Sequence, residues 1–147
     1  MGLISNQYIA GYFDGEGCVT IQLSKKGKCY SIQVSITSID FEPLNTIHQI
    51  FNGTLIYLKK SEKCKNWQNI WRWQVVSGDA YNFLITIQPY CILKKKQVDL
   101  AIEFQEYLQA TKNNRRNRRG IFIALSQEEL IKREWYKKTI SLLKQGH

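Results

Sequence analysis

The sequence predicts an α+β domain built on an antiparallel sheet of four strands. Apolar and polar residues alternate in two pairs of segments, and each pair is followed by a segment whose apolar residues recur at helical spacing. Strands that occur as pairs between helices indicate hairpins, and therefore an antiparallel sheet that helices cover on one face. The 147 residues suit a single domain, 1–147. We expect a core at about 5–110, a basic loop at 111–120 and a last helix at about 126–143.

The first helix begins at Ser5 or Asn6, either of which can cap it, and runs to about Phe13. The glycines that follow, Gly15 and Gly17, are expected to end it. Strict alternation then predicts a hairpin of two half-buried strands, at residues 19–24 and 31–37.

The second half of the core repeats this order. Asp40 is expected to cap a helix that runs to about residue 51, and Asp79 a short helix that stops near residue 89. His48 is expected to pack against the protein rather than bind a metal, because no other candidate ligand lies near it. The remaining strands are expected at 55–60 and 70–76, and further helices at 94–109 and 126–143, the last of which is opened by a capping box that starts at Ser126.

Positive charge dominates the composition. The chain has 21 Lys and Arg against 12 Asp and Glu, a formal net charge of +9, which favours a polyanionic partner, although ribosomal and membrane-surface proteins share such a charge. The partner that we expect is double-stranded DNA, with no membrane and no small-molecule substrate. The four cysteines of the chain form no C-x-x-C pair and the chain has only two histidines, so neither a zinc site nor a histidine-based nuclease is expected. No signal peptide or membrane-spanning run is visible. We expect an intracellular protein with free thiols.

Residues 9–17 read Ile-Ala-Gly-Tyr-Phe-Asp-Gly-Glu-Gly and are the most informative segment. Two acids, Asp14 and Glu16, directly follow the expected helix, where the negative end of the helix dipole disfavours carboxylates. A divalent cation held by carboxylate and carbonyl oxygens would compensate them. The alternative is an ordinary buried helix followed by a glycine turn, because short patterns also arise by chance.

One face of the predicted sheet carries polar side chains and no acid. Gln, Arg, Lys, Ser and Thr are side chains that read base edges in the DNA major groove, and a two-stranded ribbon fits that groove. An ordinary solvated face is the alternative, although such a face usually mixes Glu with Lys. The candidate DNA-binding residues are Thr20, Gln22, Ser24, Gln33, Ser35, Thr37, Tyr57, Lys59, Arg72 and Gln74.

Two basic segments favour contacts with phosphates. Three lysines at 94–96 stand at an expected helix N-terminus, where the dipole disfavours them. The unfavourable placement of these lysines and of the acids at 14–16 is explained if a metal ion and a phosphate bind between the two helix ends. A solvated run of charges is the alternative interpretation of the lysines. The acid-free loop at 111–120 is interpreted as a clamp on the phosphate backbone, with a flexible linker as the alternative. Its arginines are Arg115, Arg116, Arg118 and Arg119.

The chain resembles the LAGLIDADG homing endonucleases. It matches their signature at Ala10, Gly11, Asp14 and Gly17, and Glu16 replaces the second aspartate. The resemblance covers most of residues 5–110 and implies a saddle-shaped sheet in the order αββαββα plus C-terminal helices. Because the signature occurs once, it implies a homodimer whose signature helices pack through Ala10, Gly11 and Asp14.

The resemblance also implies roles for residues of the active site. Glu16 and the carbonyl of Gly15 would hold Mg²⁺, which Ca²⁺ or Mn²⁺ can replace for binding. Lys94, with Lys96 as the alternative, would stabilise negative charge on the phosphate. These roles follow from the family and not from the composition.

A third role concerns ordered water. Family members place a polar residue, commonly glutamine, after the second strand, where this chain has Thr37 or Ser38. We assign the role to Ser38, although the absence of glutamine is a departure from the family. A restriction-type nuclease core is disfavoured, because Cys18 stands where its acid-x-Lys pattern needs a lysine.

The implied activity is that of an intron-encoded homing endonuclease, which makes a Mg²⁺-dependent double-strand break in a long, nearly palindromic DNA target. The same scaffold used without cleavage, as an RNA maturase or a DNA-binding regulator, is the first alternative. A small basic RNA-binding protein with a chance match to the signature is the second, and it predicts a monomer.

Overall fold

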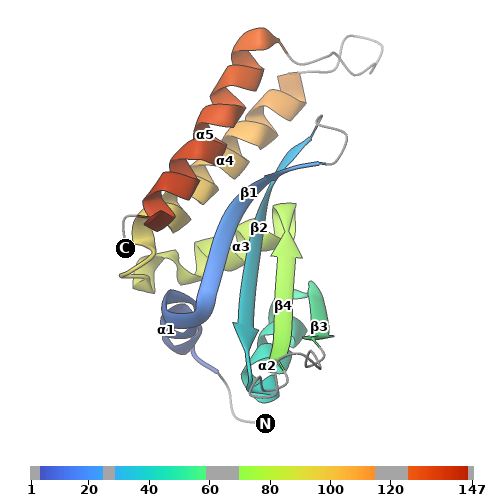
Figure 1. Cartoon of the computed structure of the whole chain (residues 1–147), viewed down its shortest axis with the longest axis vertical. Helices are drawn as coiled ribbons and strands as arrows, with labels where there is room; N and C mark the ends of the chain where they lie inside the picture. Colours follow the sequence, from blue (N-terminus) through green and yellow to red (C-terminus); the bar gives the residue numbers. More distant parts are fainter. Residues whose placement is uncertain (1–3, 25–28, 59–69, 115–125, 146–147) are drawn as a thin grey trace, which may run out of the picture.

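The computed structural model describes residues 4–24, 29–58, 70–114 and 126–145 (Figure 1). Its elements follow the order helix, two strands, helix, two strands, helix, with two long helices at the end, which confirms the α+β prediction. They are α1 (Asn6–Glu16), β1 (Gly17–Leu23), β2 (Tyr30–Ser38), α2 (Phe41–Phe51), β3 (Thr54–Leu58), β4 (Ile70–Val76), α3 (Ser77–Ile87), the 3₁₀ turn η1 (Gln88–Tyr90), α4 (Lys95–Asn114) and α5 (Gln127–Gln145).

The four strands form one antiparallel sheet in the order β1-β2-β4-β3. The two expected hairpins therefore lie side by side, with β2 and β4 in the centre. Residues opposite each other on neighbouring strands share a face of the sheet. Val34 lies opposite both Val19 and Val75, so one apolar row crosses three strands.

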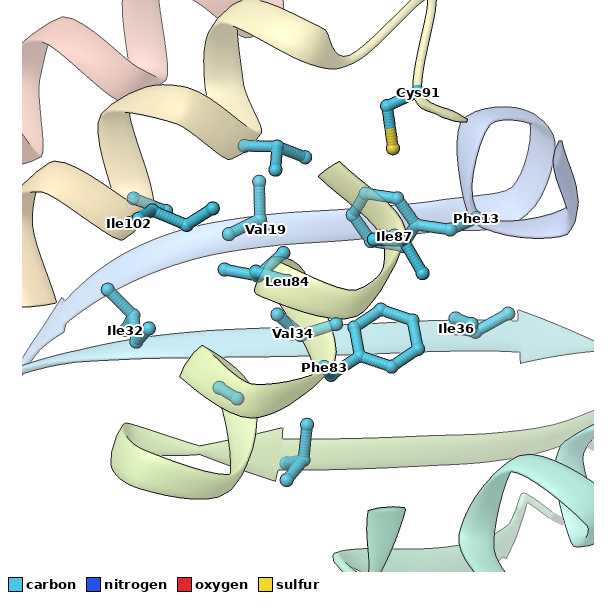
Figure 2. Packing of buried hydrophobic residues seen from close by; sticks show 14 of the residues in the cluster. Phe13, Val19, Ile32, Val34, Ile36, Phe83, Leu84, Ile87, Cys91 and Ile102 are labelled. Atoms are coloured by element: carbon cyan, nitrogen blue, oxygen red, sulfur yellow. The ribbon is translucent and has the colours of Figure 1, made fainter. Parts of the chain in front are cut away.

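The apolar face of the sheet forms the core with the helices that cover it. Ile32, Val34 and Ile36 of β2 point toward Phe83 and Leu84 of α3 (Figure 2), and all five side chains are buried. Burial of each such side chain stabilises the fold by about 1.5–3 kcal/mol. Helices α4 and α5 lie side by side near β1 (Figure 1). None of the helices in the described ranges has the length and apolar character needed to cross a membrane.

Helix α1 is longer than the sequence suggested. It ends at Glu16 rather than at Phe13, and Gly15 lies inside its last turn instead of ending it. Gly17 is the C-cap, and its N–H donates to the carbonyl of Phe13. A Cβ at Gly17 would lie 2.1 Å from the ring of Phe13. The missing side chain therefore lets β1 leave the helix directly beside a buried aromatic ring.

The expected helix caps have different outcomes. Ser5 and Ser126 cap α1 and α5, because each hydroxyl accepts a hydrogen bond from the backbone N–H three residues later. Asp40 is the N-cap residue of α2, but its carboxylate makes no capping hydrogen bond. Asp79 is not a cap, since α3 begins at Ser77 and places it in the first turn. A carboxylate there is still favoured by the helix dipole.

Two smaller predictions can be compared with the structure. His48 packs as expected: its Nε2 lies 3.0 Å from the carbonyl oxygen of Gly53, at the end of its own helix. Helix α4 begins at Lys95 and runs to Asn114, well beyond the expected end at residue 109.

Candidate active site

Asp14 and Lys94 connect the end of α1 to the start of α4. The Asp14 carboxylate accepts hydrogen bonds from three consecutive backbone N–H groups: Ile92 at 2.7 Å, Leu93 at 3.2 Å and Lys94 at 3.2 Å. In return, Nζ of Lys94 donates to the backbone carbonyl of Asp14. The carboxylate thus faces the positive end of α4, and the ammonium faces the negative end of α1.

This reciprocal arrangement corrects two expectations about the signature helix. Three backbone N–H groups of the same chain hold the Asp14 carboxylate, so Asp14 requires no metal to compensate its charge. Asp14 is 8% exposed and Ala10 is fully buried in a single chain, so the assignment of these two side chains to a dimer interface is wrong. Gly11 and Gly15 remain exposed, and a Cβ at either would meet no atom within 4 Å. The open surface of α1 runs along these glycines.

Glu16, the last residue of α1, lines a pocket of about 370 Å³. The Glu16 side chain is exposed, and no hydrogen bond within the described residues holds its carboxylate. Ser38, assigned from the sequence, lines the same pocket, and its hydroxyl accepts a hydrogen bond from the N–H of Asp40 at 3.0 Å. The structure therefore brings Glu16 and Ser38 together. The other lining residues are Tyr12, Thr37, Ile39, Asp40 and Ile70.

Tyr12 and Asp40 border this pocket although the sequence did not indicate them. Burial raises the pKa of Tyr12 above its ordinary value, the Ser38 hydroxyl partly opposes this rise, and the carboxylates of Asp40 and Glu16 add to it. Tyr12 therefore stays protonated at neutral pH. Sequence reasoning missed both residues because a tyrosine in an apolar helix suggests packing and an aspartate before a helix suggests a cap.

The oxygen donors at the end of α1 fit a hard divalent cation in part. Glu16 offers an exposed carboxylate, and Gly15 belongs to the last turn, whose carbonyls lack donors within the helix. Such oxygens are the ligands that Mg²⁺ prefers. Across the described part of the chain, no three His, Cys, Asp or Glu side chains come together to hold a metal ion. The described residues of one chain therefore offer only part of a coordination sphere.

The outward face of the sheet, which points away from the buried core, carries most of the predicted contact residues that lie in the described ranges. Ser35 lies opposite Gln74, and Thr37 lies opposite Arg72, so these side chains share one surface. The face contains no acid among its described residues. By strand register it comprises Cys18, Thr20, Gln22, Ser31, Gln33, Ser35, Thr37, Thr54, Ile56, Leu58, Ile70, Arg72, Gln74 and Val76.

Ser24 lies just beyond β1, at the end of the first hairpin. Its hydroxyl accepts a hydrogen bond from the N–H of Cys29 at 3.2 Å, and its own N–H donates to the Cys29 carbonyl at 2.8 Å. These bonds close the hairpin, a role that the sequence reasoning did not assign to Ser24.

Tyr57 lies on the core side of the sheet, so its predicted place beside Arg72 is wrong. The register pairs Tyr57 with Trp71 and Ile56 with Arg72, and the rings of Tyr57 and Trp71 lie 4.8 Å apart between centroids. A shift of one residue in a strand moves a side chain to the other face, and β3 lacks the alternation that would have fixed its register. Lys59, Arg115, Arg116, Arg118 and Arg119 lie outside the described residues.

Lys144 adds positive charge at the edge of the outward face. Its Nζ lies 3.1 Å from Sγ of Cys18, the first outward residue of β1 along the chain. The two residues are 126 positions apart, so no local pattern could have indicated this contact.

Three solved homing endonucleases share this fold. I-CvuI, solved with its target, has a TM-score of 0.69 at 19% identity, over 94% of this chain and 80% of that one. I-GzeII, solved with a DNA target, has a TM-score of 0.67 at 14% identity, and the match covers 94% of this chain and 44% of the I-GzeII chain. The archaeal intron-encoded I-Vdi141I, complexed with DNA, has a TM-score of 0.57 at 17% identity, and the match covers 93% of this chain and 96% of the I-Vdi141I chain.

Sequence comparison gives the family directly. No curated protein matches the sequence significantly. The family model described as LAGLIDADG endonuclease matches residues 9–107, more than half of the chain. That range contains most of α1, including Glu16, together with both strand pairs and Lys94. The chain therefore belongs to the LAGLIDADG endonuclease family and has its fold with a single signature helix.

Proposed function

We propose that the chain is a site-specific homing endonuclease that makes a metal-dependent double-strand break in a long, nearly palindromic DNA duplex. One observation carries this proposal: an exposed acid and a fixed ammonium lie at the same helix end, beside a sheet face whose described residues include no acid. Thr37 lines the pocket of Glu16 and also belongs to the outward face. The acid would therefore stand at the edge of the surface that contacts DNA.

The outward face provides the side chains for sequence recognition. Its Gln, Ser and Thr residues can donate to and accept from base edges, and Arg72 can bind guanine in the major groove. The net charge of +9 supports contacts with the phosphate backbone, which supply affinity without sequence preference. Two structures of the same fold, I-CvuI and I-GzeII, were solved with DNA targets.

Residues of this chain would carry the hydrolysis. Glu16 and the carbonyl of Gly15 would hold Mg²⁺, which when bound activates the attacking water and stabilises the leaving oxygen. Lys94 would stabilise charge on the phosphate, because its ammonium is fixed at the end of α1 by the carbonyl of Asp14. Ser38 would hold a water, since its oxygen already accepts the N–H of Asp40 and its own proton can be donated. I-CvuI was solved with Ca in one structure and with Mg in another.

A second copy of the chain would complete the active site. The exposed surface of α1 at Gly11 and Gly15 allows another helix to approach closely. Ile92 is 82% exposed and Leu93 is 64% exposed. Both lie beside this surface, because their backbone N–H groups donate to the carboxylate of Asp14 in α1. Exposed apolar surface of this kind marks interaction sites. A symmetric dimer would bring two Glu16 carboxylates and two outward faces to one duplex.

The test is cleavage of a duplex that the protein itself selects. Wild-type protein is used to select binding sequences from a library of duplexes randomised over two half-sites. If the reading frame lies in a self-splicing intron, the intron-less allele provides a second candidate target. We expect both strands to be cut in Mg²⁺, no cutting by Glu16→Gln, and a loss of about a hundredfold in rate for Lys94→Ala.

Glu42→Gln is the matched control, because Glu42 is an exposed acid in the first turn of α2, outside the pocket. It should cut at the wild-type rate, and Glu16→Gln should bind the selected duplex with wild-type affinity. Cutting by Glu16→Gln would contradict the metal assignment. Tight, specific binding by the wild type without any cutting would favour a DNA-binding regulator.

A further inference from the structure

Tyr12 lines the pocket of Glu16, and the family signature does not account for its hydroxyl group. The hydroxyl oxygen is buried and makes no hydrogen bond of ordinary geometry among the described residues. A buried polar group without a partner costs about 1–3 kcal/mol, so its presence calls for an explanation. The pocket it borders has room for several water molecules, at about 370 Å³.

The charges around the pocket indicate what it can hold. Glu16 and Asp40 are carboxylates, and no Lys, Arg or His is among the lining residues that the structure describes. A phosphate group would be repelled by this lining, whereas water can donate to the acids and accept from hydroxyl groups. Asp40 makes no capping hydrogen bond to α2, so its carboxylate is not occupied by the helix that it precedes.

Two contacts fix the groups that would surround such a water. The ring of Tyr12 stacks on that of Tyr8 one turn earlier, with centroids 6.1 Å apart and planes inclined by 24°. The Ser38 hydroxyl is held by the N–H of Asp40. Tyr12 comes from α1, while Ser38 and Asp40 follow from the end of β2, so the pocket joins two rigid elements.

We propose that the Tyr12 hydroxyl is a further catalytic group, which orients the water that attacks the phosphodiester bond. This inference rests on the proposed endonuclease function. In the reaction, the water oxygen forms a bond to phosphorus and gives up one proton to the solvent, the bond from phosphorus to O3′ breaks, and O3′ takes up a proton from a solvent water. Tyr12 gives up no proton in this step; it holds the water through a hydrogen bond, together with Ser38.

The experiment compares Tyr12→Phe with Tyr8→Phe on the duplex selected by the wild-type protein. Both variants keep the ring stack and lose one hydroxyl, but the exposed Tyr8 does not line the pocket. Cleavage is followed under single-turnover conditions in Mg²⁺ at a series of protein concentrations. DNA affinity is measured separately in Ca²⁺, and thermal unfolding is recorded for each variant.

We expect Tyr12→Phe to lower the maximal rate by roughly tenfold to a hundredfold. The half-saturating protein concentration and the affinity in Ca²⁺ should not change and the unfolding temperature should not fall, whereas a merely structural role would weaken binding or lower that temperature. Tyr8→Phe should behave as wild type. Incorporation of 3-fluorotyrosine at position 12, which restores a hydroxyl on the same ring, should restore the rate.

Two results would overturn the inference, and they differ in meaning. A wild-type rate for Tyr12→Phe, with the wild-type protein active, would refute the role of Tyr12 alone. A wild-type protein that binds its selected duplex but never cuts it would refute the endonuclease function, and the role of Tyr12 with it.

Discussion

Asp14 shows how one carboxylate can hold two distant segments together. It accepts three backbone hydrogen bonds at the start of α4, and its own carbonyl accepts Nζ of Lys94. Hydrogen bonds to a charged acceptor are roughly twice as strong as neutral ones. The side chain that the family signature places before Glu16 therefore positions Lys94, and Glu16 alone is left as the exposed acid.

Asp14→Asn should destabilise the protein by about 1–3 kcal/mol, because an amide turned toward three N–H groups leaves at least one of them without an acceptor. It should also lower the cleavage rate, since Lys94 is no longer held. Urea denaturation and single-turnover cleavage measure the two effects. Asp99→Asn is the control, because Asp99 accepts one side-chain hydrogen bond, from Gln88 at 2.8 Å, and its amide can still accept it. If Asp99→Asn lowered the free energy of unfolding and the cleavage rate as much as Asp14→Asn does, this role of Asp14 would be contradicted.

Cys91, which directly precedes the segment held by Asp14, gives a second prediction at this scale. Burial, followed by the nearby Asp14 carboxylate, raises the pKa of the Cys91 thiol to about 12. Because only the thiolate reacts, roughly one thiol in ten thousand is reactive at pH 8. Iodoacetamide should therefore modify the exposed Cys29 in the folded protein and leave Cys91 unmodified until the chain is unfolded. Peptide mapping by mass spectrometry distinguishes the sites, and early labelling of Cys91 would show that its surroundings open readily.

At the scale of elements, the passage from α1 to β1 depends on close packing. A Cβ at Gly17 would meet the ring of Phe13 at 2.1 Å and its carbonyl oxygen at 2.7 Å. Phe13 is fully buried and packs edge-on against Phe83 at 5.7 Å between centroids. Neither the ring nor the helix backbone can move without disturbing the core beneath Glu16.

Gly17→Ala should therefore lower the free energy of unfolding by about 1–3 kcal/mol, the usual cost of overpacking a core. Gly78→Ala is the matched control, because a Cβ at Gly78, in the first turn of α3, meets nothing within 4 Å. It should be neutral or slightly stabilising, since alanine favours helix more than glycine does. Denaturation in urea measures both variants. A neutral Gly17→Ala would mean that the start of β1 can shift away from α1.

At the scale of the molecule, the two faces of the sheet differ in burial and in the side chains that they carry. Its core face is buried beneath the helices, and its outward face remains partly exposed and carries no acid among the described residues. The open side of α1 lies at one end of this sheet, next to the pocket of Glu16. A second copy docked on α1 would extend the outward face into one continuous surface.

Gly11→Val tests this assembly separately from folding. A Cβ at Gly11 meets no atom of its own chain within 4 Å, so the variant should fold with nearly unchanged stability. A branched side chain would keep a second α1 from approaching, and the variant should be monomeric and inactive in cleavage. Sedimentation equilibrium over a range of concentrations, with circular dichroism for folding, measures both properties. A monomeric wild type, both free and bound to DNA, would refute the dimer.

The sequence by itself determined the order of the elements, the antiparallel sheet and the exposed acid at the end of the first helix. Alternation in β1, β2 and β4 places Ile32, Val34 and Trp73 inside and Gln33 and Arg72 outside, because the geometry of a strand turns successive side chains to opposite faces. Glu16 and Ser38 could likewise be named, since the family signature and a strand end mark them locally.

Only the tertiary structure decided which groups meet. The contacts of Asp14 with the start of α4 and of Lys144 with Cys18 join residues far apart in the chain, so they depend on how the helices pack. Tyr57 was placed on the wrong face because β3 has no alternation, and its register is fixed only by pairing with β4. Tyr12 and Asp40 acquire their significance from the pocket between α1 and the end of β2, which no local pattern encodes.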